Sequence, residues 1–111
     1  QELNASYNSI ENIQPLANNN ITTLKLSYNN IDNISALKNC SSLQTLILSH
    51  NSITNIQALS NKKHLKKIHL SFNNIQSLEP LKGNVNLTQV HASVNRIYSL
   101  EPLKDLNLTY L

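Results

Sequence analysis

Apolar residues recur along this chain at fixed offsets, and residues 43–59 show the pattern in full. They follow the frame L-x-x-L-x-L-x-x-N-x-I-x-x-I-x-x-L, and about five less regular residues precede the next copy. The copies are 22, 22, 22 and 21 residues apart, beginning at Ile21, Leu43, Leu65, Leu87 and Leu108. Self-similarity at a period of roughly 20–29 residues is typical of a solenoid in which each repeat forms one turn. We therefore expect one continuous stacked array without linkers.

The first half of each copy predicts a short strand. Leu46 and Leu48 are separated by one residue, and this alternation indicates a strand with one buried face. The equivalent pairs in the other copies are Leu3/Ala5, Leu24/Leu26, Ile68/Leu70 and Val90/Ala92. Stacked one per turn, such strands would form a parallel sheet with rungs about 4.8 Å apart, joined by the usual right-handed connections.

The second half of each copy predicts a tight return. Its apolar residues are three apart, a spacing that suits a 3₁₀ or irregular segment better than a full α-helix. We expect four sets to fill the interior: Ile31/Ile34/Leu37, Ile53/Ile56/Leu59, Ile75/Leu78/Leu81 and Ile97/Leu100/Leu103. Proline, whose fixed φ suits a turn outside the sheet, occupies one column of the return at Pro15, Pro80 and Pro102.

A further column of the return lies three residues beyond the last leucine and reads Cys40, Lys62, Asn84 and Leu106. Because only Cys40 and Leu106 are apolar, we expect a loose return in the two middle repeats. Cys40 is expected to be a small buried hydrophobic residue. It is the only cysteine, so no internal disulfide is possible.

One polar column follows the strands, at Asn8, Asn29, Asn51, Asn73 and Asn95. An asparagine amide both donates and accepts hydrogen bonds, and asparagine tolerates bent backbone. Stacked, the five side chains would form a ladder that satisfies turn backbone groups otherwise left without partners in the core. We assign this asparagine column a structural role.

The frame resembles the 22-residue class of leucine-rich repeats, whose members include phosphatase-regulatory subunits, an axonemal dynein light chain and bacterial internalins. The resemblance covers essentially the whole chain. The I-x-P-L and L-x-P-L turns at residues 13–16, 78–81 and 100–103 are similar to those of internalins. The Leu-Ser-aromatic-Asn strand ends at residues 26–29 and 70–73 look more like eukaryotic intracellular members. Of these two groups we favour the second.

This resemblance implies an α/β-type solenoid: a right-handed leucine-rich repeat superhelix with a parallel β-sheet on the concave face and irregular or 3₁₀ returns on the convex face. It also implies a non-catalytic scaffold that binds another protein on the concave sheet. We interpret residues 1–111 as a single array of about five repeats. Neither end shows the polar cap that normally closes a solenoid, so we expect an uncapped part of a longer chain.

Composition changes this interpretation little. The net charge is +3 and the pI is near 9.1, but no block of like charge exceeds a few residues. That is weak support for nucleic acid or a membrane surface as partner, and no apolar run approaches the roughly 20 residues that would span a bilayer. The absence of cysteine-rich caps favours an intracellular location. Six N-x-[ST] sequons argue the other way, at Asn4, Asn20, Asn33, Asn39, Asn86 and Asn107.

Alternation along the strands also determines which side chains face away from the core. The first outward column is Thr23, Thr45, Lys67 and Gln89, and the second is Asn4, Lys25, Ile47, His69 and His91. The third is serine throughout, at Ser6, Ser27, Ser49, Ser71 and Ser93. The fourth is Tyr7, Tyr28, His50, Phe72 and Val94. The serine column keeps the middle of the face flat, so that a partner can approach closely.

The fourth column contains three of the five Tyr and Phe residues in the chain. Exposed aromatic residues cluster at interface hot spots, and a solvent-facing Ile47 or Phe72 favours a surface that a partner covers. Lateral stacking that stabilises the sheet itself is the alternative. We predict a partner-binding set of Tyr7, Lys25, Tyr28, Ile47, His50, Lys67, His69, Phe72 and His91.

The histidines of this face admit two interpretations. His69 and His91 are one rung apart, a distance at which imidazoles can share zinc, but no Asp, Glu or Cys joins them on the face. We therefore expect no metal site and no cofactor. Partly protonated histidines beside Lys25 and Lys67 instead favour an acidic peptide or protein. The basic run at residues 62–67 is expected to be a solvated loop, with nucleic-acid binding and a localisation signal as alternatives.

No motif supports catalysis, because the chain has no nucleophile elbow, no paired carboxylates and no glycine-rich phosphate loop. We predict a protein-interaction scaffold in an intracellular regulatory or assembly complex. One alternative is a bacterial internalin-like surface adhesin. Another is a nucleic-acid-binding surface that uses Lys25, Lys67 and base stacking on the aromatic column. A third is an array that supports an enzyme domain elsewhere in a longer chain.

Overall fold

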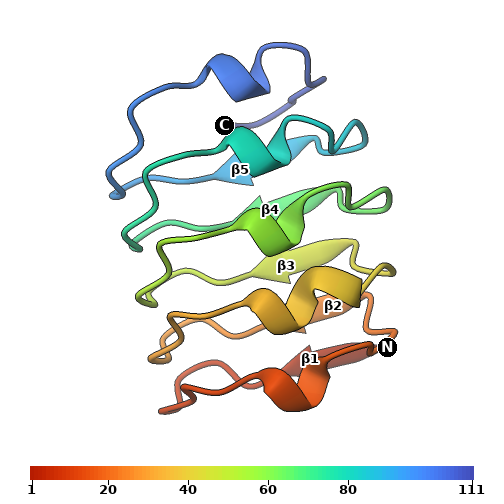
Figure 1. The fold of residues 1–111 in the computed structure, drawn as a ribbon, viewed down its shortest axis with the longest axis vertical. Coiled ribbons are helices and arrows are strands. Elements are labelled where there is room, and N and C mark those ends of the chain that lie inside the picture. The colour runs from red at the N-terminus through yellow and green to blue at the C-terminus, as the bar shows by residue number, and fades with distance from the viewer.

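The computed structural model describes all residues from 1 to 111, and each repeat forms one turn of a coil (Figure 1). One parallel sheet runs through it in the order β1-β2-β3-β4-β5. Its strands are β1 (Glu2–Asn4), β2 (Thr23–Lys25), β3 (Thr45–Ile47), β4 (Lys67–His69) and β5 (Gln89–His91). The 3₁₀ turns are η1 (Gln14–Leu16), η2 (Ser35–Asn39), η3 (Gln57–Leu59), η4 (Glu79–Leu81) and η5 (Glu101–Leu103).

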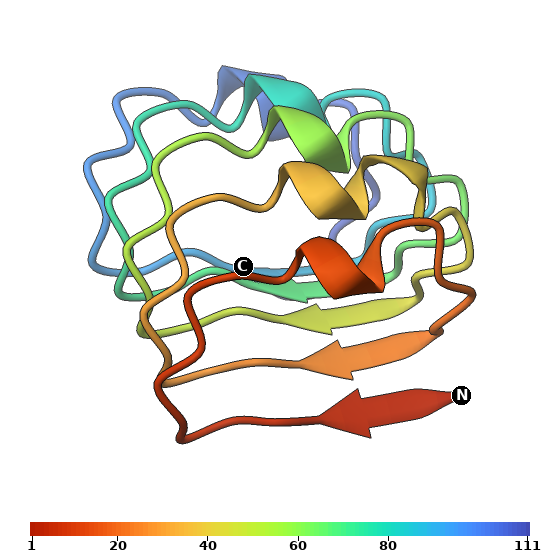
Figure 2. The ribbon, with the colours of Figure 1, turned by 60° about the horizontal axis from the view of Figure 1, so that its bottom comes forward.

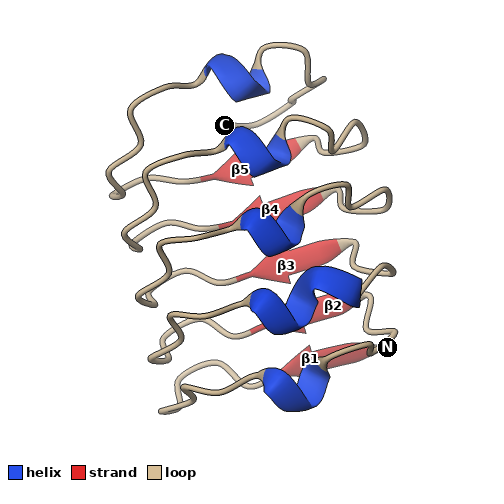
Figure 3. Cartoon of the chain, in the orientation of Figure 1, coloured by secondary structure: helices blue, strands red, loops and turns tan.

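The 3₁₀ turns stack in a layer opposite the sheet, as Figures 2 and 3 show. Pro15, Pro80 and Pro102 lie in the first turn of η1, η4 and η5, where a proline needs no amide partner. None of these turns has the length and apolar character that crossing a bilayer requires. The predicted solenoid, with strands on one side and 3₁₀ returns on the other, is confirmed.

Strand register follows the sequence frame. Leu24 pairs with Leu46, Leu46 with Ile68, and Ile68 with Val90. In β2 to β5 only this middle residue is buried, while its two neighbours are half-buried on the outer face. Together with the returns, these residues build one core of 24 buried apolar side chains. Burial of such side chains is the main force that holds the turns together.

The last repeat departs from the prediction for the interior. Leu103 is buried, but Ile97 is only half-buried and the Leu100 side chain is 55% exposed. The equivalent residue one turn earlier, Leu78, is fully buried. Within residues 1–111, η3 and η5 flank the return of Leu78, whereas only η4 lies beside the return of Leu100.

Four of the five asparagine side chains bridge consecutive turns, whereas Asn8 donates only to the Ala5 and Ser6 carbonyl oxygens of its own turn. Asn51 Nδ2 donates to the carbonyl oxygens of Leu48 in its own turn and Leu26 in the preceding turn, both at 3.0 Å. Its Oδ1 accepts from the backbone N–H of Ile31 at 3.0 Å. Asn29, Asn73 and Asn95 make the same three kinds of contact. Each of these four amides therefore satisfies backbone groups on two turns.

The return is not loose in the middle repeats, contrary to the sequence-based expectation. Lys62 is only 3% exposed, and its ammonium donates to the carbonyl oxygens of Leu37, Lys38 and Cys40. These carbonyls belong to η2 and to Cys40, the residue that follows it, where a helical turn leaves acceptors without partners and favours a positive charge. Lys62 is thus the buried exception in a basic run that was expected to be solvated.

Asn84 stands at the same position as Lys62 one repeat later, and it also hydrogen-bonds the preceding turn. It is fully buried, its Nδ2 donates to the Leu59 carbonyl at 2.9 Å, and its Oδ1 accepts from the Lys62 N–H at 2.8 Å. Two polar side chains therefore close the return by hydrogen bonding to the preceding turn, where the family pattern uses apolar packing.

We predict that Asn73→Ala lowers the free energy of unfolding by about 2 kcal/mol or more, because buried groups on two turns lose their hydrogen-bond partners. Urea denaturation followed by circular dichroism measures the change. The matched control is Asn74→Ala, since Asn74 is exposed and should tolerate the change within about 0.5 kcal/mol. Equal losses in the two variants would contradict the assigned role of the asparagine ladder.

A second prediction concerns Lys62. Burial lowers the pKa of its ammonium below the ordinary value of 10.5, although the nearby Cys40 partly opposes the shift. Between the folded and unfolded pKa values the unfolded chain binds more protons, so the stability of the folded chain rises with pH. Relative to Lys62→Met, the wild-type chain should gain stability as the pH approaches 10.5 and lose that gain as the pH falls through the folded pKa. Denaturation across a pH series tests this, with Lys63→Met as the exposed control, and parallel pH profiles would refute it.

Candidate functional site

A row of bulky side chains follows the strands at one repeated backbone position. Tyr7, Tyr28, His50, Phe72 and Val94 all have positive φ, between 53° and 61°. This left-handed region favours glycine or asparagine, and bulky residues seldom occupy it. The positive φ was not foreseen from sequence, because the Ser-aromatic-Asn segment carries no glycine to signal it.

Backbone hydrogen bonds between turns hold this position in register. The N–H of Tyr28 donates to the Ser49 carbonyl at 3.0 Å, and the N–H of His50 donates to the Ser71 carbonyl at 2.9 Å. Tyr7 and Phe72 make the equivalent bonds. The ladder of the sheet thus continues past the strand ends and places each side chain directly above the previous one.

The four ring-bearing residues of this position, Tyr7, Tyr28, His50 and Phe72, form what we call the aromatic row. Successive ring centroids are 4.4, 4.0 and 4.1 Å apart, with interplanar angles of 8°, 11° and 12°. Tyr7 is 75% exposed, Tyr28 42% and Phe72 45%. Lateral stacking is therefore present, and the same rings still reach solvent. Because their faces cover one another, the row offers ring edges along most of its length.

Lys25, Ile47, His69 and His91 lie in the outer positions of consecutive strands, each paired in register with the next. We call the surface formed by these side chains and the neighbouring Lys67 column the sheet face. The Lys25 ammonium lies 3.4 Å from a carboxylate oxygen of Glu2 on β1. The His69 and His91 rings are 3.9 Å apart at a 36° tilt.

Tyr110 belongs to this surface in addition to the residues predicted from the sequence. It forms a parallel bridge with Gln89 and stacks on His91 at 4.4 Å and 16°. It therefore continues the first outward column after Lys67 and Gln89. The signal was available, because Tyr110 lies two residues after the start of the last copy of the frame.

The structure corrects the expectation of partial protonation for His69. Burial, together with the neighbouring His91 and Lys67, lowers its pKa from 6.5 to about 4. The imidazole of His69 is therefore neutral at pH 7. Its Nε2 is buried and has no hydrogen-bond partner, a rare state for a polar atom in a folded protein.

Six of the nine predicted partner-binding residues are in ring-to-ring contact, in two separate sets. Tyr7, Tyr28, His50 and Phe72 touch through their rings, and so do His69 and His91. The other three, Lys25, Ile47 and Lys67, share the sheet face with the histidines through strand register. No group of three or more His, Cys, Asp or Glu side chains is arranged to hold a metal ion.

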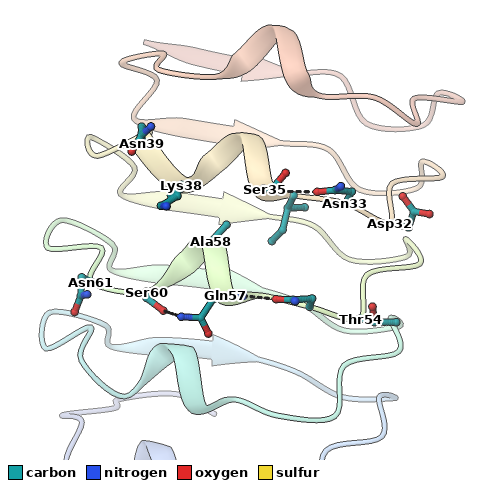
Figure 4. Close-up of a pocket in the computed structure, with 12 residues that line it drawn as sticks. Asp32, Asn33, Ser35, Lys38, Asn39, Thr54, Gln57, Ala58, Ser60 and Asn61 are labelled. Carbon is teal, nitrogen blue, oxygen red and sulfur yellow. Dashed lines mark hydrogen bonds between the residues drawn. The ribbon is translucent and has the colours of Figure 1, made fainter.

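A groove of about 940 Å³ lies on the opposite side, between η2 and η3 (Figure 4). Three of its amide side chains bond within their own turns: Asn33 Oδ1 accepts from the Ser35 N–H at 2.8 Å, Asn55 Oδ1 accepts from the Gln57 N–H at 2.8 Å, and Gln57 Nε2 donates to Ser60 at 3.2 Å. Asp32 and Lys38 are the only charged residues among those that line it. This polar groove has no convergent set of reactive groups, so the sheet face and the aromatic row are the stronger candidate site.

Comparison with known proteins agrees with the repeat geometry. A family model of two leucine-rich repeats matches residues 41–83, and a single-repeat model matches residues 17–38. The chain belongs to the leucine-rich repeat family. Proteins of this family are typically non-catalytic scaffolds that bind other proteins. No curated protein sequence matches the chain.

Two solved structures place this leucine-rich repeat chain beside bacterial proteins. An internalin (inlF) from Listeria monocytogenes covers 98% of this chain at 31% identity, with a TM-score of 0.90. An internalin C2 (inlC2) from the same organism covers 99% of this chain at 30% identity, with a TM-score of 0.82. The chain spans 33% and 59% of their respective lengths. Both are internalins, one of the two groups that the turns and strand ends resemble, and neither is a eukaryotic intracellular member.

A third prediction separates backbone strain from ring stacking in this row. Val94 is β-branched, has a φ of 53° and is 61% exposed, so Val94→Asn should raise the free energy of unfolding by about 1 kcal/mol. Tyr28→Asn relieves the same strain but removes two ring contacts worth about 0.5–1.5 kcal/mol each, and should lower it. Urea denaturation measures both changes. A gain of stability in both variants would show that stacking contributes little.

Proposed function

We propose that this leucine-rich repeat array is a non-catalytic scaffold that binds a protein partner on the sheet face and along the aromatic row. The observation that carries the proposal is the row itself. Four ring-bearing side chains occupy backbone positions that disfavour them, and their edges remain in solvent. Strained backbone concentrates at functional positions, where the side chain rather than the backbone is needed.

The surroundings of the row support contact with another protein. The serine residues beside it are short, and the half-buried Ile47 provides an apolar point between Lys25 and His69. A flat centre next to rigid aromatic side chains suits a partner whose backbone approaches closely, because ordered aromatic residues lose little conformational entropy on binding. Membership of a family whose proteins generally bind other proteins agrees with this use.

The nucleic-acid alternative gains less support. Bases stack on open ring faces, whereas the faces within the row are occupied by neighbouring rings at 4.0–4.4 Å. A base would have to separate two turns of the sheet to enter the stack. The basic run offers less charge than its sequence suggests, because Lys62 donates its hydrogen bonds to buried carbonyls.

The intracellular setting and the surface-adhesin setting both remain compatible with a binding role for this surface. The likeness to two internalins at 30–31% identity favours the internalin-like setting. Both settings require the same face to be free, so the test of the proposed function is the same for each.

The test is capture of partners by the immobilised chain, comparing the wild type with a Tyr28→Ala/Phe72→Ala double variant. Loss of two central rings from the row should reduce recovery of a specific partner by tenfold or more, since hot-spot truncations cost about 2 kcal/mol or more each. Tyr98→Ala is the matched control, because Tyr98 is 77% exposed and lies outside the row. Unchanged recovery by a folded double variant would refute the proposed site.

A further inference from the structure

Charge on the sheet face is unbalanced around β4 and β5. Lys25 is paired with Glu2, and the other ion pairs of the protein, Lys82–Glu79 and Lys104–Glu101, lie at η4 and η5. Lys67 has no carboxylate within ion-pair distance. Its register neighbours are Thr45 and Gln89, neither of which carries charge.

Next to Lys67 lies a polar atom without a partner, the buried Nε2 of His69. The groups that face His69 are Ile47 on β3, Lys67 on its own strand and His91 on β5, with Tyr110 stacked on the far side of His91. None of them carries a negative charge. The cluster therefore combines an unpaired ammonium, an unsatisfied imidazole and a second imidazole, and it lacks only an anion.

We propose that Lys67, His69 and His91 bind a carboxylate side chain from an acidic segment of the partner, and that His69 takes up a proton from solvent as the carboxylate binds. This proposal rests on the proposed function of the sheet face and specifies the chemistry of the partner. A carboxylate accepts short, charge-assisted hydrogen bonds from both an ammonium and an imidazolium, so one anion satisfies the whole cluster.

The proton uptake follows from the surroundings of His69. In the free protein, burial and the nearby Lys67 and His91 favour the neutral ring. A carboxylate at hydrogen-bond distance favours the charged ring and offsets the repulsion from Lys67. Because His69 Nε2 is covered in the free protein, a neighbouring side chain or the His69 ring itself must rotate to admit the carboxylate. Rotamer changes of this kind are common at interfaces that otherwise move little.

A peptide carboxylate fits this cluster better than a nucleic-acid phosphate chain. Nucleic-acid binding relies on several cations spaced along the backbone, but Lys67 is the one unpaired lysine of the sheet-face columns. Lys62 is buried, and Arg96 follows Asn95 beyond the strand ends. A single carboxylate needs no more than this cluster provides.

The experiment titrates the ¹⁵N-labelled 111-residue chain with a peptide of alternating glutamate and serine, and with its glutamine counterpart. We expect amide shifts confined to β4, β5 and their neighbours, from the glutamate peptide alone. The Lys67→Gln variant should bind about fivefold more weakly, the effect of losing one partly exposed ion pair. Lys63→Gln, which removes an equal charge from an exposed residue of the same basic run, should bind as the wild type does.

The pH dependence tests the proton uptake separately. If the bound carboxylate returns the pKa of His69 to its ordinary value near 6.5, the wild type should bind about tenfold more tightly at pH 5.5 than at pH 7.5. His69→Gln should lose most of this dependence, whereas His64→Gln, at an exposed position off the sheet face, should keep it. The dispersed amide spectrum shows directly whether each variant is folded.

Several results would overturn the proposal. Equal binding of the glutamate and glutamine peptides would contradict the role of the carboxylate. Equal pH dependence in the wild type and His69→Gln would contradict the proton uptake. A single-stranded RNA that binds at β4 and β5 in place of the peptide, with steep salt dependence, would replace the acidic segment as the ligand. If the peptide fails while Tyr28→Ala/Phe72→Ala still abolishes partner capture, the acidic chemistry is wrong and the scaffold function stands. If that double variant also keeps its partners, both fail.

Discussion

The backbone N–H and C=O groups of each turn of this protein must form hydrogen bonds with the adjacent turns. A strand of three residues has no partner within its own repeat, so its N–H and C=O groups are satisfied only by the strands above and below. The asparagine amides solve the same problem where the chain bends, and Lys62 and Asn84 solve it on the return. A repeat that lost this exchange would leave buried polar groups unpaired, which costs more than a hydrogen bond normally contributes.

The same exchange explains why the surface is organised in columns. Hydrogen bonds between turns continue past the strands to Tyr28, His50 and Phe72, so these side chains lie directly above one another and their rings stack. In such an array each side chain lies beside the side chains at the same position of the adjacent repeats. Rings gain from this arrangement, whereas titratable groups of like charge oppose one another. Burial is the main cause of the low pKa of His69, and the register adds to it by placing a second histidine beside the ring.

Lys62 and Asn84 show how a repeat tolerates polar residues in a column where apolar residues are usual. Each side chain reaches back one turn and hydrogen-bonds carbonyl groups at the end of the preceding 3₁₀ segment. Burying an ammonium is costly unless it is well solvated by the protein, and three carbonyl oxygens provide that solvation here. The two repeats are therefore closed by polar contacts, and the array stays regular through the middle of the chain.

The sequence by itself determined the period, the strand positions, the 3₁₀ returns and the direction in which strand side chains face. These features depend on the spacing of apolar residues within one repeat, and the same spacing recurs in every repeat of the sequence. Three other features depend on atoms about 22 residues away: the burial of Lys62, the place of Tyr110 and the neutral state of His69. The positive φ of the aromatic row likewise comes from how consecutive turns align. Only the tertiary structure decided these, because a pattern specifies which side chains face inward but not which atoms they meet there.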